Sequence, residues 1–139
     1  MLNSVIVVDD EASIRTAVEQ WLSLSGFSVQ LFAHAEACLA HLPQHFPGVI
    51  ISDVRMPGMD GLQLLERLQA NDPDLPVILL TGHGDVPMAV EAMRMGAYDF
   101  LEKPFTPQDL LGSLRRALEK RQLVLELSLI HISEPTRQA

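Results

Sequence analysis

Reactive polar side chains directly follow or closely trail four short apolar runs in this sequence. The runs and their polar residues are Val5–Val8 with Asp9 and Asp10, Val49–Ile51 with Asp53, Val77–Leu80 with Thr81, and Phe100–Leu101 with Lys103. Carboxylates are the ligands that hard divalent cations prefer, whereas hydroxyl and ammonium groups donate to phosphoryl oxygens. The set indicates a divalent-cation site built around an acidic phosphoryl acceptor.

The apolar runs explain how such distant residues meet. Short Val/Ile/Leu runs separated by helical patterns are typical of buried parallel strands. In an open α/β sheet the ligand site lies beyond the carboxyl ends of the strands. We therefore expect all these polar groups to converge on one crevice.

Strand and helix patterns alternate five times along the chain. The expected strands are the four runs above and Ser28–Phe32, and the expected helices are Glu11–Ser25, Ala35–His45 with an interruption at Pro43, Gly61–Ala70, Met88–Met95 with Asp85 as N-cap, and a last helix from Thr106. Ser28–Phe32 alternates and is expected at a sheet edge. Asp60 and Asp72–Asp74 are expected to be turn and cap residues. This order predicts right-handed crossovers and a doubly wound α/β fold.

Length and charge restrict the class of protein. A chain of 139 residues forms one domain with a full core, and its net charge of −8, from 18 acidic and 10 basic residues, argues against direct nucleic-acid binding. The single cysteine, Cys38, cannot form an internal disulfide. With neither a signal peptide nor an apolar run of about 18 residues, the sequence predicts a cytoplasmic protein without a membrane segment.

Asp53 is the expected phosphoryl acceptor. It precedes a Pro/Gly loop, Met56–Gly61, which we expect to leave the carboxylate exposed. Two carboxylates about 4 Å apart repel by about 4 kcal/mol at an effective dielectric near 20. A hard cation relieves that repulsion, and Mg²⁺ suits a set of carboxylate, carbonyl and water ligands.

Thr81 and Lys103 complete the expected chemistry. A hydroxyl and an ammonium can bind phosphoryl oxygens and stabilise the charge that develops during transfer. Pro104 follows Lys103. A cis bond there, which only X-Pro sequences adopt cheaply, would aim the lysine back over the sheet end.

Four motifs resemble those of the response-regulator receiver domain, in order and spacing, over about residues 3–121. They are Val-Val-Asp-Asp-Glu, Ile-Ser-Asp-Val-Arg-Met-Pro-Gly-Met-Asp-Gly, Leu-Thr-Gly-His-Gly and Leu-Glu-Lys-Pro-Phe. The resemblance implies a flavodoxin-like parallel sheet of five strands in the order 2-1-3-4-5, with helices on both faces. It also implies that Asp53 takes a phosphoryl group from the phosphohistidine of a sensor histidine kinase.

The resemblance further assigns ligands and switch residues. It implies that Asp10, Asp53 and the Arg55 backbone carbonyl bind Mg²⁺, with Asp9 assisting through water. It matches Thr81 and Lys103 to the phosphate-binding hydroxyl and lysine, and Phe100 to the switch aromatic, where many relatives carry Tyr. His83 and the Arg55 side chain are candidate modulators of the phosphorylated state.

The motifs around Thr81 and Lys103 also resemble those of sigma-54-dependent transcriptional activators, in particular C4-dicarboxylate transport regulators. The resemblance implies a phosphoacceptor signalling domain that controls transcription and assists its own phosphorylation and dephosphorylation, rather than an enzyme. In such proteins an AAA+ ATPase domain and a helix-turn-helix DNA-binding domain follow the receiver. We therefore expect this chain to be an isolated N-terminal piece.

The C-terminal part is divided by its patterns. We expect a receiver domain over residues 1–121, a helical extension or linker over 122–127, and a non-native tail over 128–139, which lacks periodicity and resembles vector-encoded sequence. Leu111, Leu118 and Leu125 lie seven residues apart. This spacing predicts a homodimer contact on the last helix, with a geometry that depends on phosphorylation.

Three alternative classes of protein fit the sequence less well. A Mg²⁺-dependent aspartyl phosphatase would carry a second Asp two residues after its nucleophile, where this chain has Arg55. A flavin-binding flavodoxin would want a glycine- and hydroxyl-rich loop after the first strand, where this chain has Asp9, Asp10 and Glu11. A receiver-like interaction module that is never phosphorylated should lack Asp53, Thr81 or Lys103, and all three are present.

Overall fold

The computed structural model describes residues 3–132, apart from the side chains of His83 and of residues 128–132. The strands are β1 (Ser4–Val8), β2 (Ser28–Phe32), β3 (Val49–Asp53), β4 (Val77–Thr81) and β5 (Asp99–Glu102). The helices are α1 (Ala12–Leu24), α2 (Ala35–His41), α3 (Gly61–Asn71), the short 3₁₀ turn η1 (His83–Asp85), α4 (Val86–Met95) and α5 (Pro107–Ile132).

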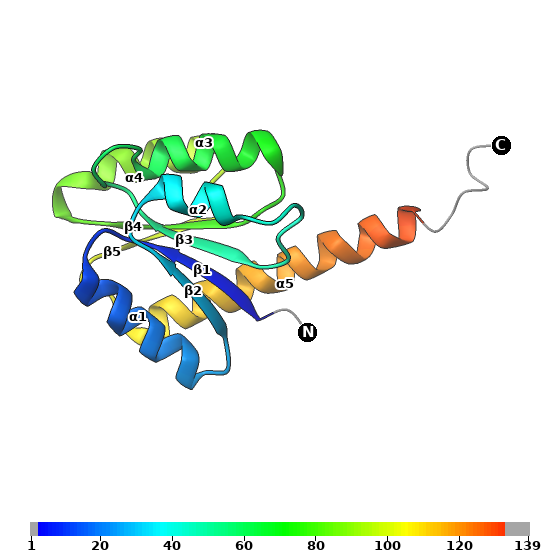
Figure 1. Ribbon diagram of the computed structural model, residues 1–139, viewed down its shortest axis with the longest axis horizontal. Coiled ribbons are helices and arrows are strands. Elements are labelled where there is room, and N and C mark those ends of the chain that lie inside the picture. Colours follow the sequence, from blue (N-terminus) through cyan, green and yellow to red (C-terminus); the bar gives the residue numbers. More distant parts are fainter. Residues whose placement is uncertain (1–2, 133–139) are drawn as a thin grey trace.

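The five strands form one parallel sheet in the order β2-β1-β3-β4-β5, which confirms the predicted topology. Helices α1 and α5 cover one face of the sheet, and α2, α3 and α4 cover the other (Figure 1). The chain order places β2 and β5 at the two edges. Both edge strands are partly exposed, whereas β3 and β4 are buried throughout.

Successive residues of the central strands pack alternately into two separate hydrophobic cores, one on each face of the sheet. In β1, Val5 and Val7 pack on the side of α1 and α5, while Ile6 and Val8 pack on the side of α2, α3 and α4. The same alternation holds in β3 and β4 because neighbouring side chains of a strand point to opposite faces. Burial on both faces explains why these strands read as continuous apolar runs.

The helix ends follow local chemistry. Asp60 caps α3 in a capping box with Gln63, which confirms its predicted role. Gly96 ends α4 with a φ of 111°, in the left-handed region that glycine adopts without a steric penalty. Helix α2 ends at His41 instead of His45 because the chain turns away at Leu42, immediately before Pro43.

Helix α5 runs through the expected helical extension over residues 122–127. It is continuous from Pro107 to Ile132, so the boundary predicted at residue 121 lies within a helix, and the predicted tail begins inside the same helix. Residues 133–139 of that tail lie outside the described residues. No helix in the described part of the chain combines the length and apolar character needed to cross a bilayer.

Two of the three heptad leucines of α5, Leu111 and Leu118, face inward. Leu118 is buried in the core beneath α1 and α5, and Leu111 packs against the same core. Using this stripe as a contact between copies was therefore a wrong expectation for these two leucines, because they already hold α5 on its own domain. Among the α5 leucines whose side chains the structure describes, Leu123 and Leu127 are the exposed ones, at 61% and 65%.

A buried arginine fixes α5 where it passes the amino ends of the strands. The Arg121 side chain is 2% exposed, and its Nη2 donates to Asp72 Oδ2 at 2.6 Å and to the Phe46 carbonyl at 2.8 Å. Asp72 also accepts from the Asp74 backbone N–H, which confirms its turn role. Burial raises the pKa of Asp72, but the Arg121 guanidinium outweighs burial and holds that pKa below its usual value.

Asp72→Asn is expected to lower the unfolding free energy by about 1–3 kcal/mol at pH 7, because it leaves the buried Arg121 without its carboxylate. Since the folded-state pKa of Asp72 is lowered, this stabilisation is present above the unfolded pKa of about 3.9 and is lost as the pH falls through the lower folded value. Denaturant unfolding from pH 7 to pH 3 measures both. The exposed neighbour Asp74 provides the control variant, Asp74→Asn. An Asp72→Asn effect equal to the control at pH 7 would contradict this assignment.

Candidate functional site

Three carboxylates meet at the carboxyl ends of β1 and β3. Asp9 and Asp10 follow β1, Asp53 is the last residue of β3, and one ligand oxygen from each lies within 4.8 Å of the others. The convergence expected from the strand pattern is therefore present for these three carboxylates. Carboxylate oxygens at this spacing fit a divalent cation, and the exposed Asp10 leaves the cluster open to solvent.

Backbone hydrogen bonds hold Asp9 in place. Its N–H donates to the Phe32 carbonyl at 3.1 Å, which extends the pairing of β1 with β2. Its Oδ1 accepts from the Glu11 N–H at 2.9 Å, and Arg15 donates to its carbonyl at 2.6 Å. Asp9 is also fully buried. Burial and these hydrogen bonds together fix the direction of its carboxylate.

The loop after Asp53 is drawn back against the strand it leaves. The Gly61 N–H donates to the Val54 carbonyl at 2.7 Å, which brings the start of α3 against the end of β3. A Cβ at Gly61 would overlap with the Asp53 carbonyl oxygen. Glycine is therefore required for this close approach.

Asp53 itself is less accessible than expected. The Pro/Gly loop was predicted to leave it exposed, but the residue is only 5% exposed. The loop folds over toward α3, and the Arg55 backbone N–H bonds to the carboxylate. The expectation was wrong because loop composition says nothing of the side chains that close over a strand end.

Lys103 is the cation of the site. Its Nζ lies 3.4 Å from Asp53 Oδ2, 3.5 Å from Asp9 Oδ2 and 3.4 Å from Glu11 Oε1. The Lys103 N–H donates to the Thr81 carbonyl at 2.7 Å, so the lysine is anchored beyond the end of β4. The Lys103–Pro104 bond is cis, as expected from the sequence.

The carboxylates and the lysine shift one another's protonation. Burial, and then the charge of Asp9, raise the pKa of Asp53 to about 6, although Lys103 and the Arg55 N–H act in the opposite direction. Burial likewise raises the pKa of Asp9. Burial lowers the pKa of Lys103, but its three carboxylate neighbours outweigh burial and leave that pKa above its usual value.

Thr81 and Phe100 lie on the neighbouring strands. Thr81 ends β4 and is fully buried, and its Oγ1 has no hydrogen-bond partner within the described residues. A buried hydroxyl without a partner is uncommon because it loses its bonds to water. Phe100, on β5, is half-buried and packs against the core beneath α2, α3 and α4.

The Arg55 side chain makes a contact that sequence reasoning missed. Its Nη2 lies 2.8 Å from Asp85 Oδ1, at the end of η1. Asp85 occupies the predicted N-cap position of α4. Its side chain, however, makes no capping hydrogen bond there. The side chain of His83, the other candidate modulator, lies outside the described side chains.

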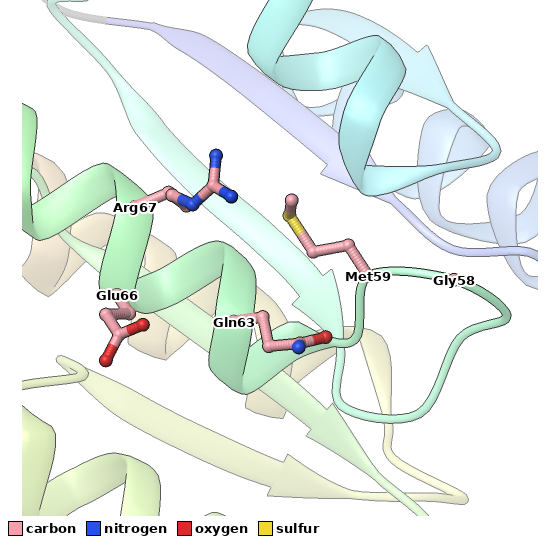
Figure 2. A pocket seen from close by; sticks show the side chains of 5 residues that line it. All are labelled: Gly58, Met59, Gln63, Glu66 and Arg67. Atoms are coloured by element: carbon pink, nitrogen blue, oxygen red, sulfur yellow. The ribbon is translucent and has the colours of Figure 1, made fainter.

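A shallow pocket of about 280 Å³ lies beside the loop that precedes α3. Gly58 and Met59 of this loop line it, together with three residues of α3, namely Gln63, Glu66 and Arg67 (Figure 2). None of the three clustered carboxylates contributes to its lining. The carboxyl edge of the sheet, rather than this pocket, therefore holds the chemistry.

Comparison with known proteins agrees with this architecture. The chain matches the response regulator receiver domain family over residues 5–115 and belongs to that family, whose members are phosphoacceptor signalling modules. It is 56% identical over 123 residues to the C4-dicarboxylate transport transcriptional regulatory protein DctD of Rhizobium meliloti. That match covers 88% of this chain and 27% of the relative, so the chain spans about a quarter of the length of that regulator.

Solved structures show the same fold. Full-length FixJ from B. japonicum superposes with a TM-score of 0.83 at 41% identity, over 97% of this chain and 66% of that chain. The receiver domain of NtrX from Brucella abortus superposes with a TM-score of 0.79 at 40% identity, over 83% of this chain and 98% of that chain.

Asp53→Asn is expected to stabilise the domain in the presence of a chelator, by about 1–3 kcal/mol at pH 7.5, because it removes a carboxylate whose ionised form is disfavoured in the folded state. Denaturant unfolding with and without the chelator measures the change. Glu66→Gln, on the exposed face of α3, controls for the loss of one negative charge. A variant no more stable than wild type would show that Lys103 fully offsets the repulsion.

Proposed function

We propose that Asp53 accepts a phosphoryl group from the phosphohistidine of a sensor histidine kinase, in a Mg²⁺-dependent reaction. The observation that carries this proposal is the position of Asp53 between the carboxylates of Asp9 and Asp10 and the ammonium of Lys103, 3.4 Å away. An Asp53 oxygen forms a bond to phosphorus while the bond from the kinase imidazole nitrogen to phosphorus breaks, and the imidazole keeps the electron pair. The product is an aspartyl phosphate.

Asp10, Asp53 and the Arg55 backbone carbonyl would hold Mg²⁺, with Asp9 assisting through water. The carboxylate cluster supports this assignment, since oxygen ligands at a strand edge suit a hard cation. When bound, Mg²⁺ supplies the positive charge that offsets the phosphoryl oxygens. Asp9 has a second role, because its contact with Lys103 aims the ammonium at the acceptor.

Lys103 and Thr81 would bind the phosphoryl oxygens after transfer. Lys103 already bridges Asp9 and Asp53 and need only shift toward the new anion. The Thr81 hydroxyl gains a partner by turning toward the phosphoryl group, which relieves a buried donor that has none among the described residues. The same groups would assist both phosphorylation and dephosphorylation.

Movement of Thr81 would alter the surface formed by α4, β5 and α5. Thr81 ends β4, and Phe100 lies on the adjacent β5, where it is paired in register with Leu79. A displaced Thr81 leaves space that Phe100 can fill from its half-buried position. A phosphoryl group can drive this change only because it binds one arrangement better than the other.

In the natural protein this surface would control a transcriptional activator of the sigma-54-dependent type. The relatives that share its sequence are longer transcriptional regulatory proteins, which supports further domains after the receiver. By the family resemblance, these would be an AAA+ ATPase domain and a DNA-binding domain. A protein with such an output would act in the cytoplasm. The receiver itself would make no direct contact with nucleic acid.

Incubation with Mg²⁺ and a small acyl phosphate is expected to add the mass of one phosphoryl group to the protein. Intact mass spectrometry measures the addition, which should vanish in Asp53→Asn or with a chelator and should need more Mg²⁺ in Asp10→Asn. Asp74→Asn, exposed and remote from the cluster, is the matched control. Undiminished addition to Asp53→Asn would refute the acceptor, and no addition to wild type would favour an interaction module that is never phosphorylated.

The domain is also proposed to form a homodimer through α4, β5 and α5. Exposed apolar side chains support this surface: Val90 and Met93 on α4, at 47% and 39%, and Leu123 and Leu127 on α5, at 61% and 65%. They replace the inward-facing heptad as the proposed contact. Single exposed leucines are common, so it is the occurrence of exposed apolar side chains on both α4 and α5, the two helices that pack against β5 from opposite faces of the sheet, that supports the assignment.

Beryllofluoride with Mg²⁺, a stable phosphoryl mimic, is expected to shift the monomer–dimer equilibrium in sedimentation. Leu123→Gln should weaken the dimer at least several-fold, whereas Leu24→Gln, at the 82% exposed Leu24 of α1, should leave it unchanged. Thr81→Ala should remove the response to the mimic. A monomer in both states, or a full response in Thr81→Ala, would contradict the proposal.

A further inference from the structure

One side chain links the phosphoacceptor loop to the start of α4. Arg55 Nε donates to Asp85 Oδ1 at 2.9 Å, its Nη2 lies 2.8 Å from the same oxygen, and its Nη2 also contacts Met88 Sδ at 3.4 Å. Arg55 lies two residues after Asp53, whereas Asp85 and Met88 belong to η1 and the first turn of α4. This contact therefore crosses between the acceptor and the segment that follows Thr81.

The Asp85 side chain does not cap α4, although Asp85 occupies the N-cap position of that helix. An aspartate at an N-cap position normally accepts a hydrogen bond from its own helix. Asp85 makes no such bond, and its carboxylate faces Arg55 instead. The first turn of α4 thus lacks a side-chain cap while the ion pair is formed.

Helix α4 is also lightly anchored. Its buried residues are two alanines, Ala89 and Ala92. Helix α3, in contrast, buries three leucines, Leu64, Leu65 and Leu68. The larger α4 side chains that pack against the core, Met88 and Met95, are only partly buried. A contact at the start of α4 therefore contributes to fixing its position.

We propose that the Arg55–Asp85 ion pair restrains the start of α4 in the unphosphorylated domain, and that a phosphoryl group on Asp53 releases it by taking the Arg55 guanidinium. The release step rests on the proposed function of Asp53. The Arg55 side chain is 68% exposed and free to reorient, so its bond to Asp85 is exchangeable. A phosphoryl dianion two residues away offers a guanidinium more charge and more acceptor oxygens than one carboxylate does.

Release would free the segment after β4, because η1, which joins Thr81 to α4, loses its tie to the acceptor loop. Thr81 can then approach the phosphoryl group. Arg55 would thus be a phosphoryl-binding residue as well as a restraint, and Asp85 a restraint alone.

The restraint is tested first without any phosphoryl group. Amide hydrogen exchange of residues 86–95 is compared in the full chain and in Asp85→Asn, Arg55→Gln and the double variant. Each single variant is expected to speed α4 exchange several-fold, and the double variant to add nothing further, because both changes break one pair. Arg67→Gln and Asp74→Asn are the matched controls.

The release step is tested by affinity for beryllofluoride in the presence of Mg²⁺. Asp85→Asn should bind the mimic several-fold more tightly, because the competitor for Arg55 is gone. Arg55→Gln should bind it several-fold more weakly, because a phosphoryl ligand is lost. A purely structural role would move both affinities in the same direction.

Faster α4 exchange together with opposite affinity shifts supports the proposal. Unchanged exchange in both folded single variants, or affinities that move in the same direction, overturns it. Should Asp85→Asn fail to fold, Asp85→Ser keeps a capping side chain and removes the charge. Wild-type protein that gains no phosphoryl group would overturn the proposed function of Asp53, while the exchange measurement would still decide whether the restraint exists.

Discussion

The burial of two neighbouring carboxylates, Asp9 and Asp53, is the constraint around which this domain is arranged. Asp9 and Asp53 are almost fully buried, each within about 3.5 Å of Lys103, and burial raises the pKa of both acids. A globular core does not normally accept such a cluster, because each buried charge needs compensation. Here the compensation comes from one lysine and from backbone N–H groups, and it is incomplete. The remaining imbalance makes the site receptive to a cation.

The rest of the sheet holds the incompletely compensated carboxylates in fixed positions. Residues of β1, β3 and β4 alternate between two apolar cores, so the strands that carry the acids cannot slide without exposing one core. The lysine is held separately, through the backbone bond between Lys103 and Thr81 at 2.7 Å. The acids are thus on the central strands, while the groups that respond to them lie toward the edge strand β5 and the lightly anchored α4.

The sequence predicted the sheet and the meeting of its polar residues because both follow from local patterns. Apolar runs bounded by Asp, Thr or Lys mark buried strands and their ends, and parallel topology brings those ends together. The missed features depend on contacts between distant residues. Arg121 pairs with Asp72 across 49 positions and Arg55 with Asp85 across 30, and an isolated charged residue gives no local sign of burial or of its partner. The burial of Asp53 was missed for the same reason.

The buried Arg121 fixes α5 at one point, and the part of the helix after Arg121 can act as a rigid arm that pivots there. Arg121 binds Asp72 and the Phe46 carbonyl near the amino ends of β3 and β4, and α5 continues from there to Ile132, beyond the body of the domain (Figure 1). At a rise of about 1.5 Å per residue, that arm is about 16 Å long. A tilt of about 10° at this pivot would move its tip by about 3 Å, given that length. A small tilt of α5 caused by a change near β5 would therefore displace the end of the helix by several ångström. The helix itself would not need to change its conformation.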